Sequence, residues 1–135
     1  MARQGVSQRG RARADRRLTG TEPSGTKPRN AAERRAARWY RLRGYRILAT
    51  NCWLSGNEID IVARRGSTIV FCEVKSKSGD RFGDPLEMVT AEKARRIRRA
   101  ADAWLARDRE AAGLAVRFDV LAEWAGRLEH VPDAF

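Results

Sequence analysis

The chain has 135 residues and a hydrophobic content of 42%, both typical of a single folded domain with a real core. Its 28 Lys and Arg residues outnumber 17 Asp and Glu residues and leave a net charge of +11, which favours a polyanionic partner because contacts to phosphates release counterions. The sequence has no apolar run long enough to span a membrane and no apolar segment of a secretory signal at its start, so we expect a cytoplasmic protein without a membrane partner.

The cysteines and the histidine argue against two further kinds of chemistry. Cys52 and Cys72 lack the spacing of metal ligands, and Cys72 falls on the apolar face of a predicted strand, which favours reduced structural thiols. A single histidine, His130, argues against a zinc site and against catalysis by histidine. We expect it to be structural or to lie at the surface.

Residues 1–29 lack apolar periodicity and are rich in Arg, Gly, Ser, Thr and Pro. This composition predicts a disordered basic tail before a domain that spans residues 30–135. The tail carries +6 of the net charge of +11. It fits an electrostatic arm for nucleic acid, and it fits equally a solvated extension or a start codon placed too early.

A first helix is predicted to begin after Asn30, which suits the N-cap, and to end at Gly44, which suits the C-terminal cap. Its apolar stripe has helical spacing and consists of Ala32, Ala36, Trp39 and Tyr40. Strands are predicted at residues 45–50, 58–63 and 69–75, with an irregular segment at 51–57 and a turn at Arg65-Gly66. We therefore expect the three strands to form an antiparallel meander.

The second half of the chain is predicted to return to a helix. A polar loop spans residues 76–85, and Thr90 then caps a long helix that ends near Arg107. A strand at residues 116–120 and a short edge strand at 127–131 complete the domain. The order of elements predicts an α/β fold in which helices cover a sheet of four or five strands.

The strand at residues 69–75 carries two charges at its end. Side chains alternate along a strand, so Glu73 and Lys75 share a face with Phe71. If the turn before this strand places Arg64 opposite Ser67, then Glu58 faces Glu73, and Asp60 faces Phe71 with Glu73 as its diagonal neighbour. A simple three-residue loop would instead move Asp60 to the other face.

Carboxylates at such distances repel one another unless a cation lies between them. Oxygen ligands suit Mg²⁺ or Mn²⁺, so Asp60, Glu73 and Glu58 are candidate metal ligands. Such a metal polarises a phosphate and activates a water, while Lys75 orients that water or stabilises the developing charge. The alternative is a surface cluster in which Lys75 and nearby arginines neutralise the acids.

These residues resemble a known family. Glu58-Ile59-Asp60 followed by Glu73-Val74-Lys75 resembles the PD-(D/E)xK nuclease superfamily, whose fold is restriction-endonuclease-like. More closely, residues 30–135 resemble the YraN-like family of bacterial proteins, which is similar to archaeal Holliday-junction resolvases. That closer likeness is carried by Gly44-Tyr45-Arg46-Ile47-Leu48, Gly83-Asp84-Pro85, Lys93 and Arg117-Phe118-Asp119-Val120.

The resemblance implies a central mixed sheet flanked by helices and a site that binds Mg²⁺ or Mn²⁺. It assigns catalytic roles to Asp60, Glu73 and Lys75, and it adds Glu33 of the first helix. Glu33 also stands at the third position of that helix, where a glutamate forms a capping box with Asn30. The chain departs from the family where Ala32 precedes Glu33 and where Asn57 separates Gly56 from Glu58. The resemblance also implies a homodimer, because a junction has two-fold symmetry.

Candidate contacts to nucleic acid lie outside the acidic motifs. The basic face of the second helix supplies Lys93, Arg95, Arg96 and Arg99 for phosphates. Trp53 is expected in a loop before the acidic strand, where its ring could stack on a base. A solvated helix face is the alternative for the basic residues.

The sequence thus predicts a metal-dependent endonuclease that acts on DNA rather than RNA, including branched or flapped DNA. Two alternatives stay open: a catalytically inactive nucleic-acid-binding module of the same fold, and a protein-interaction adaptor whose charge keeps it soluble.

Overall fold

The structure is a computed structural model that describes residues 30–77 and 89–135. The predicted basic tail and the Gly83-Asp84-Pro85 segment lie outside the described residues. The elements are α2 (Ala31–Leu42), β1 (Arg46–Leu54), β2 (Asn57–Arg65), β3 (Thr68–Lys77), α3 (Ala91–Arg107), the 3-10 helix η3 (Arg109–Ala111), β4 (Ala115–Trp124) and β5 (Arg127–Val131).

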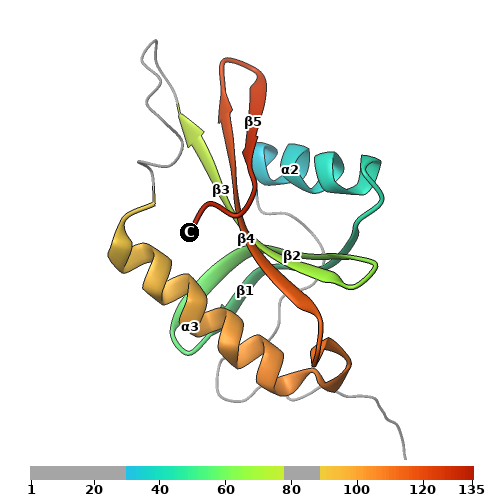
Figure 1. Ribbon diagram of the computed structural model, residues 1–135. Helices are drawn as coiled ribbons and strands as arrows, with labels where there is room; N and C mark the ends of the chain where they lie inside the picture. Colours follow the sequence, from blue (N-terminus) through green and yellow to red (C-terminus); the bar gives the residue numbers. More distant parts are fainter. Residues whose placement is uncertain (1–29, 78–88) are drawn as a thin grey trace, which may run out of the picture.

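The strands form one mixed sheet in the order β1-β2-β3-β4-β5. β1, β2 and β3 make the predicted antiparallel meander, and β5 pairs antiparallel with β4. β3 and β4 are parallel. Between them in the chain, α3 returns along the sheet, so that β4 begins beside the first residues of β3 (Figure 1). The predicted α/β fold, with helices covering a mixed sheet, is confirmed.

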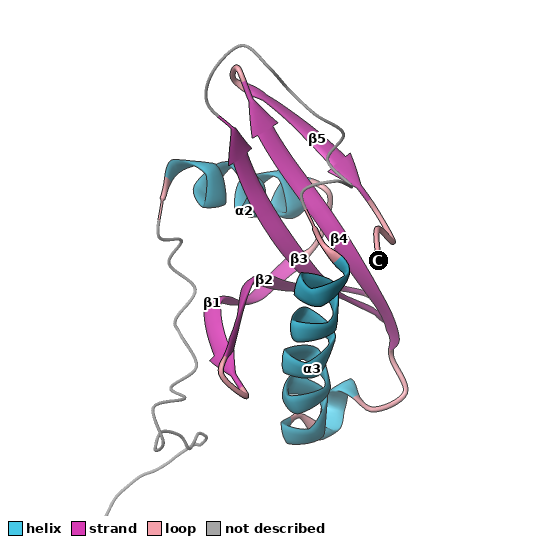
Figure 2. Cartoon of the chain, turned by 90° about the vertical axis from the view of Figure 1, so that its left-hand side faces the viewer, coloured by secondary structure: helices cyan, strands magenta, loops and turns pink. Residues whose placement is uncertain are grey.

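The two helices pack on opposite faces of the sheet, so the domain has two cores (Figure 2). On one face, Ile97 of α3 packs with Phe71 and Phe118. On the other, Tyr40 of α2 packs with Val70 and Leu121. This division follows from alternation along β3, since Phe71 and Val70 are neighbours that point to opposite faces.

The caps of α2 follow the sequence prediction. The Asn30 side chain accepts a hydrogen bond of 2.9 Å from the backbone N–H of Glu33. At the other end, the N–H of Tyr45 bonds to the carbonyl of Tyr40, and the N–H of Gly44 bonds to that of Arg41. Gly44 has φ +88°, as this C-terminal motif requires. Thr90 caps α3 in the same way as Asn30 caps α2.

The segment 51–57 differs from its prediction as an irregular loop. β1 continues to Leu54, and Cys52 pairs with Ile59. Asn51 keeps its place in the strand with φ +51°, a conformation that asparagine tolerates better than most residues. The reversal takes place at Ser55 and Gly56, which both have positive φ, as in a tight hairpin. Trp53 therefore lies on a strand and not in a loop.

The register between β2 and β3 also differs from its prediction. Arg65 pairs with Thr68, so the hairpin loop is Gly66-Ser67 and not Arg65-Gly66. Gly66 has φ +59°, which a two-residue hairpin loop requires at its first position. The observed register shifts the predicted pairing by two residues. Because the shift is even, Asp60 stays on the predicted face, but its level in the sheet is that of Glu73 and not of Phe71.

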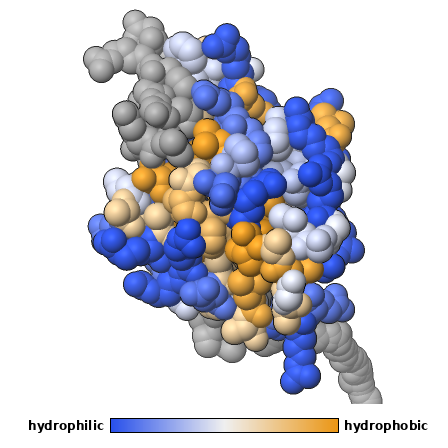
Figure 3. Space-filling view, viewed as in Figure 1, coloured by the Kyte–Doolittle hydropathy of each residue, from blue (hydrophilic) through white to orange (hydrophobic). Residues whose placement is uncertain are grey.

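Side-chain polarity is unevenly distributed over the surface. On the face shown in Figure 3, hydrophobic residues form a band between groups of hydrophilic residues. Large apolar side chains that are well exposed include Leu42 and Trp53. Within residues 30–77 and 89–135, no helix is long and apolar enough to cross a membrane.

Candidate active site

The candidate site lies where β2 separates from β3. The last pair in their ladder is Ile61 with Cys72, so Asp60 and Glu73 are the first residues beyond it. In place of a further ladder bond, the backbone N–H of Val74 donates a 2.8 Å hydrogen bond to Oδ2 of Asp60. The divergence of the strands thus leaves two acids side by side at an open end of the ladder.

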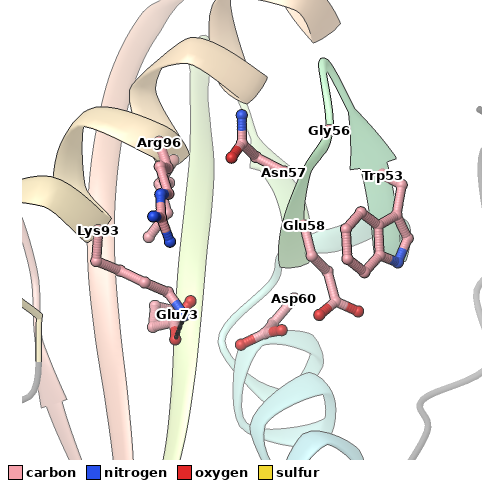
Figure 4. Close-up of a pocket in the computed structure, with 9 residues that line it drawn as sticks. Trp53, Gly56, Asn57, Glu58, Asp60, Glu73, Lys93 and Arg96 are labelled. Carbon is pink, nitrogen blue, oxygen red and sulfur yellow. Dashed lines mark ion pairs between the residues drawn. The ribbon is translucent and has the colours of Figure 1, made fainter.

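A hollow of about 200 Å³ opens at this point. Its walls come from the β1–β2 hairpin, from β3 and from α3, and the lining residues are Trp53, Gly56, Asn57, Glu58, Asp60, Glu73, Lys93, Arg96 and Ile97. Figure 4 shows the carboxylates of Glu58 and Asp60 on the hairpin side, with Glu73 and Lys93 on the other side. Acidic and basic groups from separate parts of the sequence therefore share one small space.

Two lysines neutralise Glu73, whose side chain is only 5% exposed. The ammonium of Lys75 and that of Lys93 each lie 3.2 Å from the same atom, Oε2 of Glu73. Lys75 is two residues along the same strand, as the alternation predicted. Lys93 reaches across from α3 to form this ion pair, which its predicted contact to a phosphate did not include.

Asp60 is the most strongly perturbed carboxyl of the site. Burial is the main cause that raises its pKa, and the negative charge of Glu73 raises it further, while the hydrogen bond from Val74 opposes both. The charges of Glu33 and Glu58 add smaller increases, and the pKa of Asp60 reaches about 7. Asp60 therefore lies within the electrostatic reach of all three other acids.

Glu33 comes to this cluster from α2. Its side chain is buried, with the whole residue 3% exposed, and its backbone N–H is held by the Asn30 cap. The same first turn of the helix thus places a buried carboxylate near Asp60 and fixes the helix end. The structure is compatible with both roles that the sequence left open for Glu33.

The donor set fits a hard divalent cation. Asp60 and Glu73 offer carboxylate oxygens from adjacent strands, and the pKa of Asp60 is raised first by burial and then by the negative charge of Glu73, a repulsion that a cation would offset. In the described part of the chain, no three His, Cys, Asp or Glu side chains converge on one point closely enough to hold a metal as they stand. Glu58 lines the hollow, so its role as a third ligand stays a prediction.

The basic residues of α3 divide into two groups. Lys93 and Arg96 line the hollow, and Arg96 pairs with Glu92 at 2.6 Å on the same helix. Arg95 and Arg99 are exposed on α3 but do not line the hollow. Phosphate contacts nearest the acids would therefore come from Lys93 and Arg96, and those of Arg95 and Arg99 would lie farther out.

Trp53 borders the hollow from β1. It pairs with Glu58 across the hairpin, and it is 47% exposed. Arg43 covers Trp39 at 3.9 Å and Arg127 lies over Trp124 at 5.9 Å, whereas among the described residues no guanidinium or aromatic ring packs on Trp53. Its ring is therefore an exposed aromatic surface beside the acids.

Comparison with known proteins identifies the family. Residues 32–122 match the model of "Uncharacterised protein family UPF0102". The chain belongs to this family. It is 46% identical over 94 residues to a UPF0102 protein of Geobacter metallireducens, an alignment that covers 67% of this chain and 76% of the relative. It is also similar to a UPF0102 protein of Frankia casuarinae, with 45% identity over 94 residues, which covers 66% of this chain and 79% of the relative.

The match spans every acid of the site, together with Lys75 and Lys93. It confirms the likeness to the YraN-like family that the motifs suggested.

On the other face of its sheet, this UPF0102 chain has a buried polar cluster around Asp119, a residue that is 0% exposed. Oδ2 of Asp119 accepts a 2.8 Å hydrogen bond from the hydroxyl of Tyr40 and lies 2.8 Å from Nε2 of His130. Arg117 donates to both carboxylate oxygens at 2.8 Å. The predicted structural role of His130 agrees with this arrangement.

Sequence reasoning noted Asp119 only as part of a family motif and did not foresee its partners. Burial alone would raise the pKa of Asp119, but hydrogen bonds from His130, Arg117 and Tyr40 outweigh it and hold that pKa well below its usual range. The cluster joins α2, β4 and β5. In the UPF0102 chain it thus fixes α2, the helix that carries Glu33.

Proposed function

We propose that this UPF0102 protein is a Mg²⁺- or Mn²⁺-dependent endonuclease that hydrolyses phosphodiester bonds in DNA, including branched or flapped DNA. The observation that carries the proposal is the placement of Asp60 beside Glu73 at the end of the β2–β3 ladder, in a hollow that Lys93 and Arg96 also line. Hydrolysis of a phosphodiester by a metal ion needs carboxylates that bind the metal and basic side chains that bind the phosphate. This hollow has both kinds of group.

Each residue of the site has a role in the proposal. Asp60 and Glu73 would hold the cation, and Glu58 is the candidate third ligand. When bound, the cation supplies Lewis-acid polarisation of the phosphate and a lower pKa for an attacking water. The proposal gives Lys75, which lies 3.2 Å from Glu73, the role of orienting that water and of stabilising the negative charge that develops on the phosphate oxygens. Glu33, buried on the α2 side, is the candidate for accepting the proton of the water.

The test is cleavage of labelled four-way, flapped, single-stranded and duplex DNA, each with Mg²⁺, Mn²⁺ or EDTA. Metal-dependent cleavage by the wild type, lost in both Asp60→Ala and Glu73→Ala, supports the proposal. Asp102→Ala serves as the matched control, because Asp102 is an exposed acid of α3 that does not line the hollow. Cleavage that survives both site substitutions would overturn it, as it would then come from a contaminant or another site.

A catalytically inactive nucleic-acid-binding module is the second candidate. It is favoured by the two lysines that already neutralise Glu73, and by the finding that no three potential ligands converge in the described ranges. Calorimetry separates the two candidates. Salt-dependent binding of an oligonucleotide without any heat of Mn²⁺ binding favours the binding module, whereas binding of Mn²⁺ that is lost in Asp60→Ala favours the nuclease. For either candidate, sedimentation with and without a four-way junction tests the expected homodimer.

A further inference from the structure

Lys93 lies in an unusual place for a residue that binds phosphate. Its ammonium is 3.2 Å from Oε2 of Glu73, the oxygen that Lys75 also contacts at 3.2 Å. Two ammonium groups on one oxygen repel each other, and the negative charges of Glu58 and Asp60 in the same hollow offset this repulsion. A divalent cation bound by Asp60 and Glu73 would compensate those acids and would add two positive charges beside both lysines.

Of the two lysines, Lys93 has more freedom to leave. Lys75 stands on β3, two residues from Glu73, and its side chain is 30% exposed. The side chain of Lys93 is 39% exposed and extends from a separate element, α3, to reach Glu73 at the wall of the hollow. A long lysine stem can swing towards solvent at little cost when its ion pair is lost.

We propose that Lys93 is an exchangeable cation: it neutralises Glu73 in the metal-free protein, and a divalent cation displaces it so that it can bind a phosphate of the nucleic acid. This inference rests on the proposed function, because it takes the metal site at Asp60 and Glu73 as given. It makes metal binding and phosphate binding cooperative, since the metal releases the group that the phosphate needs. By linkage, nucleic acid then strengthens metal binding by the same factor.

Arg96 provides a matched control. It lines the same hollow and carries the same charge, but its partner is Glu92, at 2.6 Å on the same helix, and not Glu73. Long-range attraction to a phosphate affects both residues alike. Of these two α3 residues, it is Lys93 whose ion pair a metal at Glu73 would break.

The direct test measures the accessibility of the Lys93 amine. The full chain is treated with a limiting amount of an amine-acetylating reagent in EDTA, in Mn²⁺ and in Ca²⁺, and modification at each lysine is quantified by mass spectrometry. The exchange predicts that saturating metal increases labelling of Lys93 about threefold or more and changes that of Lys75 less. Calorimetry on the same sample shows whether the metal is bound.

A second test measures binding of a fluorescent oligonucleotide in Ca²⁺ and in EDTA. Lys93→Met should weaken binding about tenfold in Ca²⁺ and clearly less in EDTA, where Lys93 is held by Glu73. Arg96→Met should weaken binding by the same factor in both conditions. The metal dependence of the Lys93 effect is the readout that a simple change of net charge would not produce.

The outcomes separate this inference from the proposed function. Metal binding without a change in Lys93 labelling, or equal effects of Lys93→Met in Ca²⁺ and EDTA, overturns the exchange and leaves the nuclease proposal standing. No metal binding at all overturns the metal dependence of the proposed function, and the exchange with it. Increased labelling together with the metal-dependent effect supports the exchange.

Discussion

Oδ2 of Asp60 accepts a 2.8 Å hydrogen bond from the backbone N–H of Val74. The bond takes the place of a ladder bond at the level where β2 leaves β3, and it fixes an acid next to Glu73 in spite of their mutual repulsion. The price is visible in the pKa of Asp60, which burial and the charge of Glu73 raise to about 7.

Asp60→Asn should therefore stabilise the metal-free protein at pH 8. Because the folded-state pKa is raised, the ionised carboxylate destabilises the fold, and this cost is absent below the unfolded-state pKa of about 4, grows as pH rises towards about 7 and is constant above it. We expect a gain on the order of 2 kcal/mol at pH 8 and little gain at pH 4, measured by denaturant unfolding in EDTA. Asp102→Asn on the exposed side of α3 is the control. Equal effects of Asp60→Asn at both pH values would contradict the electrostatic account.

Glu33→Gln should separate the two roles of Glu33. Glutamine can still form a capping box, so the free energy of unfolding should change by less than about 0.5 kcal/mol. The carboxylate is lost, so cleavage of DNA should fall at least about tenfold if Glu33 accepts a proton. Asn30→Ala is the complementary variant, with an expected loss of about 1 kcal/mol of stability. Full activity in a stable Glu33→Gln protein would assign Glu33 to the cap alone.

Trp53→Ala should weaken binding to single-stranded DNA about tenfold, and Trp53→Phe should weaken it less, because phenylalanine keeps a stacking surface. The dependence of affinity on salt should be unchanged, since no charge is removed. Fluorescence anisotropy with a labelled oligonucleotide measures both quantities. Leu42→Ala removes another exposed apolar side chain, one that does not line the hollow, and should have no effect. Wild-type affinity in Trp53→Ala would remove this residue from the interface.

Asp119→Asn should destabilise the protein by about 3 kcal/mol at pH 7, because it leaves the partners of a buried carboxylate without their charge. The pKa of Asp119 is held below its usual range, so its contribution is present above the unfolded-state pKa and is lost as pH falls below about 4. The difference between wild type and variant should accordingly shrink between pH 7 and pH 3 in urea unfolding. A difference that is constant over this range would show that packing, not charge, is responsible.

Local features of this fold were predictable from sequence because they depend on near neighbours. Asn30 and Thr90 cap their helices as expected, and alternation along β3 put Glu73 and Lys75 on one face. The predicted register of β2 against β3 was wrong by two residues. The position of the turn depends on which residue adopts a positive φ, and Gly66, not Arg65, begins the loop.

Contacts between distant elements were beyond sequence reasoning. The ion pair of Lys93 with Glu73 depends on how α3 lies across the sheet, and a basic helix face gives no sign of it. The cluster around Asp119 likewise unites Tyr40, Arg117 and His130, which are far apart along the chain. Asn51 led to an error of another kind. Asparagine is common in loops, so the first strand was predicted to end before it, whereas Asn51 lies inside β1.

The Gly66-Ser67 loop has a consequence for any attempt to alter this domain. It lies at the far end of the hairpin from the acids, yet its length decides whether Glu73 shares a face of the sheet with Asp60, because one added residue would turn every later side chain of the pairing to the opposite face. A one-residue insertion there should erase the site without touching any of its groups, whereas a two-residue insertion should shift the level of Glu73 and keep it on the face of Asp60. The number of residues in a remote turn, and not their chemical type, thus determines whether the acids of the site lie together.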